Sequence, residues 1–172
     1  MGGQIVLGVD PGTAVTGYGV VSERGSALRA VDHGVIRTPS SDHLSDRLLN
    51  LSQAFDHLMN RFSPQAVAVE SIFFNRNVRS ALSVGHARGV ILLGAARHGV
   101  PVFEYAPLEV KRSVTGYGRA DKKQVQVMVA NLLGLSSYPR PKDAADALAV
   151  AICCSFSQGF RQLVKSLEED RR

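Results

Sequence analysis

Hydrophobic residues at the start of the chain occur in short runs separated by turn residues, a pattern typical of β-strands. The run Ile5–Asp10 is apolar until it ends on an acid, and the Asp-Pro-Gly sequence at 10–12 then favours a turn. Two further β-rich runs follow, at Thr16–Ser22 and Ala27–Arg37, with a Glu-Arg-Gly turn between them. Because the connections are short, these runs predict a three-stranded antiparallel meander.

The hydrophobic period then changes from that of a strand to that of a helix. Behind the cap candidates Ser41 and Asp42, apolar residues recur at helical spacing: Leu44, Leu48, Leu51, Phe55, Leu58, Met59 and Phe62. Pro64 ends this predicted helix. Residues 66–70 then form another short apolar run, which again ends on an acid, Glu70.

The rest of the chain alternates between the two patterns. A helical segment at about 75–98 precedes a strand at about 101–104. Asp121 with Gln124 is typical of a capped helix start, so we expect a helix from there to about residue 133. Pro141 is placed to begin the last helix, where its missing N–H costs nothing.

These elements predict one α/β domain over residues 1–172, with about 160–172 as a flexible tail. We expect a mixed five-stranded sheet, the meander plus two parallel strands, flanked by helices. The longest apolar run, Ala147–Cys154, is far shorter than the roughly 20 residues of a membrane span. No signal-peptide pattern opens the chain, so the expectation is an unexported, cytoplasmic protein.

Cysteine and histidine offer little chemistry in this sequence. Cys153 and Cys154 are adjacent in an apolar stretch, which predicts two buried side chains rather than a disulfide or a zinc site. The five histidines lack metal-ligand spacing.

Basic residues are clustered rather than spread evenly. The chain carries 20 Lys and Arg against 15 Asp and Glu, a net charge of +5. Most of this excess lies in 111–123, which holds the single acid Asp121 and five basic residues, Lys111, Arg112, Arg119, Lys122 and Lys123. Such a cluster favours a polyanionic partner, although many basic patches are only solvated surface.

Four carboxylates stand where a sheet would bring them together. Asp10 and Glu70 each end an apolar strand, and parallel strands end at the same edge of a sheet. Asp143 and Asp146 are three residues apart, so they share one face of the last helix's first turn. Taken singly, each acid has an ordinary interpretation, as a turn former or a helix-dipole partner.

As a set, the four acids indicate a metal centre. Carboxylates gathered within a few ångströms repel one another unless a cation lies between them. Oxygen ligands suit Mg²⁺ or Mn²⁺, and two such ions can support the in-line displacement of a phosphodiester. The sequence therefore predicts a divalent-metal site.

Several motifs together resemble the bacterial Holliday-junction resolvases of the RuvC family, in order over about residues 5–151. They are DPGT at 10–13, TGYG at 16–19, Glu70, GHARGV at 85–90 and DAADALA at 143–149. The resemblance implies a ribonuclease H-like fold and a homodimer that cuts four-way DNA junctions symmetrically with Mg²⁺ or Mn²⁺, two ions per site. It also implies 5′-phosphate and 3′-hydroxyl ends and cooperation with the RuvA–RuvB branch-migration complex.

The resemblance assigns roles to particular residues. Asp10, Glu70, Asp143 and Asp146 would be the catalytic, metal-binding acids, and Lys111 and Lys122 match basic positions near the scissile phosphate. Arg119 and Lys123 would reach more distant phosphates. Each of these four basic residues could instead be ordinary surface.

Residues after Glu70 are further candidates for DNA contact. Phe73 would stack on an unpaired base or wedge a base step open, unless it packs in the core, which is the stronger reading for Phe74. Arg76 and Arg79 would hold the backbone.

Small residues recur every four positions along the long helix, at Ala81, Gly85 and Gly89. Glycine lowers helix stability, so a compensating close contact is expected there. We hypothesise a two-fold dimer interface; packing against the chain's own sheet is the alternative.

Three rival functions remain for experiment. An actin-like ATPase or sugar kinase also begins with an acid, glycine and threonine after a strand, but it needs two such domains, and this chain has no GxxxxGK loop. A tyrosine recombinase would leave the four acids unexplained. A protein that binds junctions without cutting them would use the acids structurally.

Overall fold

The computed structural model describes residues 3–71 and 78–169, apart from the side chains of 78–80, 158 and 168. Its centre is a five-stranded sheet in the order β3-β2-β1-β4-β5. The strands are β1 (Gln4–Asp10), β2 (Val15–Arg24), β3 (Ala27–Arg37), β4 (Ala66–Glu70) and β5 (Val102–Tyr105). β1, β2 and β3 pair antiparallel, whereas β4 runs parallel to both β1 and β5. The predicted meander with two parallel strands is therefore confirmed.

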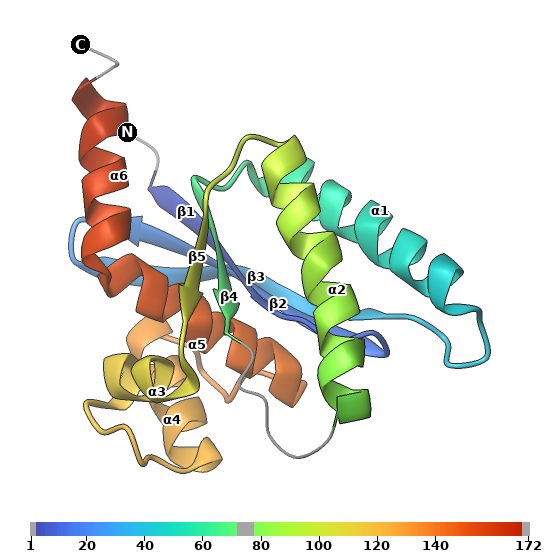
Figure 1. Cartoon of the computed structure of the whole chain (residues 1–172). Helices are drawn as coiled ribbons and strands as arrows, with labels where there is room; N and C mark the ends of the chain where they lie inside the picture. The colour runs from blue at the N-terminus through green and yellow to red at the C-terminus, as the bar shows by residue number, and fades with distance from the viewer. Residues whose placement is uncertain (1–2, 72–77, 170–172) are drawn as a thin grey trace.

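Helices cover both faces of this sheet (Figure 1). On one face lie α1 (Leu44–Phe62) and α2 (Val78–Arg97), and on the other lies α5 (Lys142–Phe156). Three more helices pack around α5: α3 (Pro107–Thr115), α4 (Lys122–Leu133) and α6 (Gln158–Glu169). The result is a three-layer α/β arrangement.

Alternation along the strands produces two separate cores, because successive side chains point to opposite faces of the sheet. Leu7 and Val9 of β1 pack with α1 and α2, around Phe55 and Ile91. Val6 lies on the other face, with the buried side chains of α5. Unlike the strands, α5 is buried almost all round, from Ala144 to Ser155, so it is the central helix of the second core.

Two helices were not predicted. α3 has Pro107 in its first turn, Val110 and Val114 buried on one face, and Glu109 accepting a hydrogen bond from the Ala106 N–H (2.7 Å). Residues 158–169, most of the predicted tail, form α6, and Phe160 of this helix is fully buried.

Two predicted helix starts differ in detail. Residue His43, rather than Ser41 or Asp42, precedes the first turn of α1 and makes no side-chain capping bond. Pro141 stands immediately before α5 rather than inside it.

Within the part of the chain that is described, no single helix is long and apolar enough to cross a membrane. α5 and α6 together reach the required length and hydropathy as a pair bent by 65°.

Candidate active site

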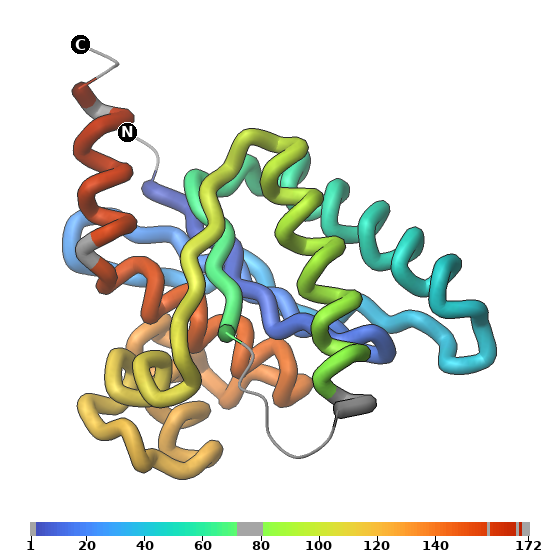
Figure 2. Tube along the Cα trace, in the orientation of Figure 1, coloured from blue at the N-terminus to red at the C-terminus, as the bar shows by residue number. Residues whose placement is uncertain are grey.

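Asp10 and Glu70 end neighbouring strands at one edge of the sheet. β1 and β4 are parallel, and Val9 pairs with Val69, so the next residue of each strand is the acid. Both chain traces leave the sheet at the same edge (Figure 2). The sheet thus fixes two carboxylates side by side, as expected from the sequence.

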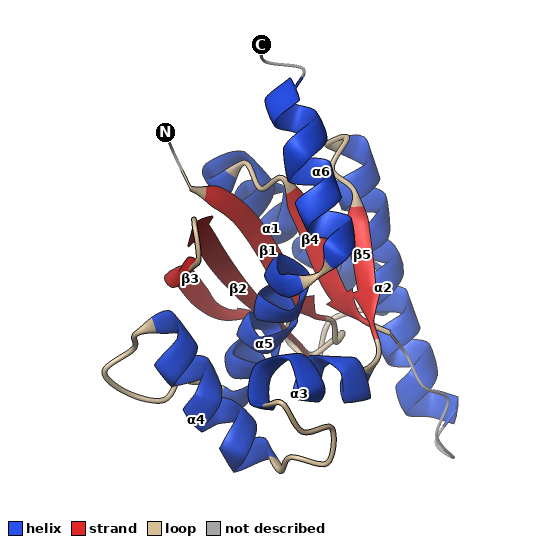
Figure 3. Ribbon diagram, turned by 90° about the vertical axis from the view of Figure 1, so that its left-hand side faces the viewer, coloured by secondary structure: helices blue, strands red, loops and turns tan. Residues whose placement is uncertain are grey.

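Glycines in β1 and β2 let α5 lie directly on this part of the sheet (Figure 3). A Cβ added at Gly17 would overlap the main-chain oxygen of Asp143, and one at Gly8 would lie 2.8 Å from the Ala151 nitrogen. Since Gly17 pairs with Asp10, the start of α5 is held against the end of β1. This close approach places Asp143 and Asp146 beside the two strand-end acids.

Hydroxyl groups fix the turn that follows Asp10. Thr16 Oγ1 donates to the Gly12 carbonyl (2.7 Å) and accepts from the Gly12 N–H (3.2 Å). Thr38 Oγ1 donates to the Thr13 carbonyl, and Thr13 Oγ1 bonds Ser83 Oγ on α2. The threonines of the DPGT and TGYG motifs therefore fix the turn that follows Asp10.

The four acids act on one another electrostatically. Burial, and then the charges of Asp146, Glu70 and Asp143, raise the pKa of Asp10 from 3.8 to about 7. Burial and the charge of Asp146 also raise the pKa of Glu70. We call these four residues the acid cluster: they come from β1, β4 and α5, and their negative charges oppose one another.

Two predicted lysines lie within electrostatic range of this cluster. Lys122 Nζ donates to Asp146 Oδ2 at 3.3 Å, and this carboxylate is the main cause of the raised pKa of Lys122. Lys111 and Lys122 both act to lower the pKa of Glu70. The Lys122 side chain is 74% exposed, so the ion pair contributes at most about 1 kcal/mol to stability, and the lysine remains accessible to a ligand.

Arg88 of the GHARGV motif supports the site through a contact that the sequence does not indicate. Its guanidinium pairs with Glu104 of β5 (2.5 Å) and donates to the Glu70 carbonyl (3.5 Å). Arg88 therefore joins α2 to the ends of β4 and β5 and fixes the main chain of Glu70. Since Glu104 and Glu70 are 34 residues apart, only the folded sheet reveals this link.

Oxygen donors alone make up the acid cluster, a set that suits hard divalent cations. Among the described residues, no three acidic, His or Cys side chains converge closely enough for a preformed metal site. Nevertheless, the charges of the other three acids raise the pKa of Asp10, so all four carboxylates share one electrostatic environment. A cation bound there would relieve their repulsion. The residues therefore fit such a group, whose binding would draw their side chains together.

The other residues predicted to contact DNA lie on α4, on the loop before it, on α2, or outside the described residues. Lys123 is in the first turn of α4 and Arg119 in the loop before it; both are exposed. Arg79 lies in the first turn of α2. Phe73, Phe74 and Arg76 fall outside the described residues.

The small residues of α2 do not pack against the chain's own sheet. At Gly85 and Gly89, no described atom lies within 4 Å of an added Cβ. The helix instead packs on the sheet side through Ala87, Ile91 and Ala95. The intrachain alternative is therefore wrong for the two glycines.

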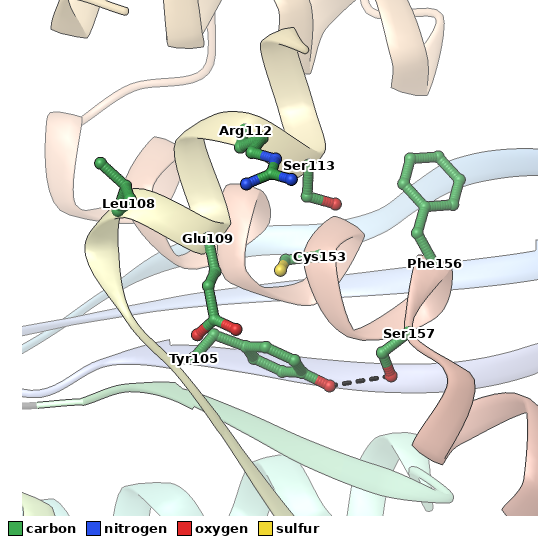
Figure 4. A pocket seen from close by; sticks show the side chains of 8 residues that line it. All are labelled: Tyr105, Leu108, Glu109, Arg112, Ser113, Cys153, Phe156 and Ser157. Carbon is green, nitrogen blue, oxygen red and sulfur yellow. Dashed lines mark hydrogen bonds between the residues drawn. The ribbon is translucent and has the colours of Figure 1, made fainter. Parts of the chain in front are cut away.

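A cavity of about 500 Å³ lies among α3, the end of α5 and the start of α6 (Figure 4). The Tyr105 hydroxyl donates to Ser157 Oγ there (2.9 Å), and burial raises the pKa of this tyrosine. Burial also raises the pKa of Cys153 to about 11, which keeps the thiol protonated at neutral pH. Both cysteines are buried, as the sequence predicted.

A mixed sheet with carboxylates at the ends of two parallel strands and on the helix across them defines the class of ribonuclease H-like nucleases. A family model described as crossover junction endodeoxyribonuclease RuvC matches residues 6–154. The chain therefore belongs to the RuvC family.

Individual relatives cover nearly the whole chain. The crossover junction endodeoxyribonuclease RuvC of Rubrobacter xylanophilus is 58% identical over 90% of this chain and 86% of its own length. That of Alkaliphilus oremlandii is 48% identical, with 94% and 99% covered. Among solved structures, Thermus thermophilus RuvC in complex with a Holliday junction substrate has 37% identity and a TM-score of 0.87, over 93% of this chain and 97% of that one.

Proposed function

We propose that this protein is an endonuclease that resolves four-way DNA junctions during recombination and repair, by symmetric metal-dependent hydrolysis. The observation that carries the proposal is the acid cluster, held at one sheet edge of a chain that belongs to the RuvC family. The similarity to a RuvC solved with a Holliday junction supports the four-way junction as substrate.

Asp10, Glu70, Asp143 and Asp146 would hold the divalent cations, which we propose are two Mg²⁺ or Mn²⁺ ions. When bound, these cations activate the attacking water and neutralise charge on the phosphate. Because the pKa of Asp10 is about 7, its carboxyl must lose a proton to become a ligand, so cation binding is weaker at acid pH. Cleavage would leave a 5′-phosphate and a 3′-hydroxyl.

Lys122 and Lys111 are suited to the scissile phosphate. Lys122 already bonds a cluster carboxylate through an exposed ammonium, which leaves it accessible to a phosphate oxygen. Positive charge there would stabilise the charge that develops in the transition state. We propose Arg119, Lys123, Arg76 and Arg79 as contacts to more distant phosphates, and Phe73 as a wedge or stacking residue.

We further propose a homodimer formed through the exposed face of α2. This face combines Gly85 and Gly89 with two exposed leucines, Leu82 (59%) and Leu93 (62%), and begins near Ala81. Glycines let two helices approach closely, and leucines at exposed positions gain by burial. A two-fold interface would present two equivalent sites to the two strands that are cut.

Gly85→Leu tests this interface without disturbing the monomer, because the added side chain meets no described atom of its own chain. We expect monomers by light scattering and an unchanged or higher melting temperature, since leucine has the better helix propensity. Gln53→Leu, at an exposed position of α1, is the control for adding a leucine to a helix surface. A Gly85→Leu protein that is still fully dimeric would contradict the interface.

The cellular setting follows by the same resemblance. We propose that the protein acts in the cytoplasm on junctions delivered by the RuvA–RuvB branch-migration complex. Loading of the junction by purified RuvA and RuvB, measured as faster cleavage, is the test of that partnership.

The decisive experiment incubates a synthetic mobile four-way junction with the protein and Mg²⁺ or Mn²⁺, and maps products at nucleotide resolution. We expect paired, symmetric nicks that a ligase can seal, and none after Asp10→Asn, Glu70→Gln or Asp146→Asn. Glu169→Gln, at the exposed end of α6, is the matched control.

Other outcomes would support the rivals. Cleavage in EDTA with a covalent protein–DNA product would favour a tyrosine recombinase. Tight junction binding without nicks would favour a junction-binding protein, and saturable ATP binding would favour the kinase-like class.

A further inference from the structure

A cavity of about 490 Å³ lies between β3 and the segment that joins α4 to α5. His33 of β3 contributes to its wall, and the joining segment contributes Ser136, Ser137, Tyr138 and Arg140. Among the described residues that line it, none is acidic. The cavity thus offers hydroxyl donors and a guanidinium, the opposite of the acid cluster.

Its side chains are available to a large ligand. Ser136, Ser137, Tyr138 and Arg140 are all exposed, Tyr138 by 50%. A ligand that runs across the surface can therefore reach each of them.

The cavity also lies close to the acid cluster. Arg140 precedes Asp143 by three residues, which span at most about 11 Å. On the sheet, Gly17 packs against Asp143 and pairs with Val35, and His33 is two residues from Val35 on the same face of β3, about 7 Å away. A molecule bound over the acid cluster can therefore extend into contact with this cavity.

We propose that this cavity, here called the arm subsite, binds the sugar–phosphate backbone of the DNA arm beside the cleaved link. The inference rests on the proposed function and adds a contact to it. Successive phosphates of one DNA strand are about 3.4 Å apart along the helix axis, so a site at most about 11 Å from Asp143 lies within about three nucleotides of the cut.

Arg140 is the principal ligand in this arrangement. A planar guanidinium binds two phosphate oxygens at once, and serine and tyrosine hydroxyls donate to the same kind of group. Contacts to phosphate carry no base information, but they set the register of a strand. Arg140 is therefore a positioning residue that fixes which link lies over the acids.

Arg140→Gln, compared with Arg29→Gln, tests the subsite. Both variants remove one exposed arginine, but Arg29 lies near the start of β3, six residues before Val35. We expect Arg140→Gln to weaken junction binding in EDTA by about tenfold and to reduce the slope of log affinity against log salt by about 1. In cleavage, KM should rise by more than kcat falls. Arg29→Gln should match the wild type, and an equal effect of both variants would overturn the subsite.

Junctions with one uncharged methylphosphonate link, moved along the arm, locate the contact. In the wild type, binding should drop when the neutral link is within about three nucleotides of the cut, and in Arg140→Gln that drop should vanish. A penalty that is the same in both proteins at every position would overturn the proposal.

A second variant guards against misfolding. Tyr138→Phe removes one hydroxyl from an exposed side chain, and we expect a smaller loss of affinity, about threefold, at the same arm position. The two proposals fail differently. If the wild type neither binds nor cuts junctions, the proposed function is wrong; if it cuts them and Arg140→Gln behaves like the wild type, only the arm subsite is wrong.

Discussion

Replacing Asp10 by asparagine should make the metal-free protein more stable while it abolishes cleavage. Asp10 is partly buried beside three other carboxylates, and its pKa rises from 3.8 to about 7 on folding. Each pKa unit corresponds to 1.36 kcal/mol, so ionised Asp10 opposes folding by about 4 kcal/mol above pH 7. Asparagine resembles the protonated acid in shape and carries no charge.

The sign of the pH dependence follows from the direction of this shift. A carboxyl whose pKa is raised by folding binds its proton more tightly in the folded chain. Its favourable contribution is complete below about pH 3.8 and is lost as the pH rises to about 7. The advantage of Asp10→Asn should therefore be largest at pH 8 and shrink by about 1.4 kcal/mol for each pH unit below 7.

Urea denaturation in EDTA at several pH values measures this difference, with Glu169→Gln as the control for loss of an exposed carboxylate. Adding Mg²⁺ should then narrow the difference, because a cation at 100 times its Kd stabilises the wild type by about 2.7 kcal/mol and binds more weakly to Asp10→Asn, which has lost a ligand. If Asp10→Asn were no more stable than the wild type at pH 8 in EDTA, the burial and repulsion that raise the pKa of Asp10 would not act as described.

Two further changes test the support of the site. Gly17→Ala should destabilise the protein by about 1–3 kcal/mol in urea denaturation and reduce cleavage, because the methyl group pushes α5 away from β1; Gln53→Ala, at an exposed position of α1, should instead be neutral or stabilising. Lys122→Met should change stability by less than about 1 kcal/mol but lower the single-turnover cleavage rate by about 100-fold, whereas Lys123→Met should affect junction affinity instead. Equal rates for the two lysine variants would remove Lys122 from the site.

Local sequence signals account for what could be predicted of the fold. The helix α4 begins where its signal lies: Asp121 accepts from the Gln124 N–H (2.8 Å), and Gln124 accepts from the Asp121 N–H (2.8 Å). The strands that end on Asp10 and Glu70 were visible as apolar runs, because buried parallel strands have no polar face.

Apart from α3, the features that the sequence does not predict depend on contacts between distant segments. α3 has a local start signal, Pro107 in the first turn with Glu109 two residues later. Its apolar face is short, however, because only Val110 and Val114 are buried and the basic residues Lys111 and Arg112 lie between them. No local pattern indicates that Arg88 fixes the main chain of Glu70. Gly17 was visible only as part of a motif, and its purpose depends on a helix more than 120 residues further along.

The position of α5 links the stability of the fold to the chemistry of the site. This helix is the centre of one core, and its buried residues Ala147 and Leu148 are adjacent to Asp146 in sequence. Packing that favours a close helix–sheet contact therefore also forces Asp143 and Asp146 toward Asp10, against their electrostatic repulsion. The packing of α5 in the core favours the close approach that the repulsion between the carboxylates disfavours, and a bound cation would remove that repulsion. A fold held together in this way keeps the four carboxylates in one electrostatic environment before any cation arrives, and cation binding then draws their side chains together.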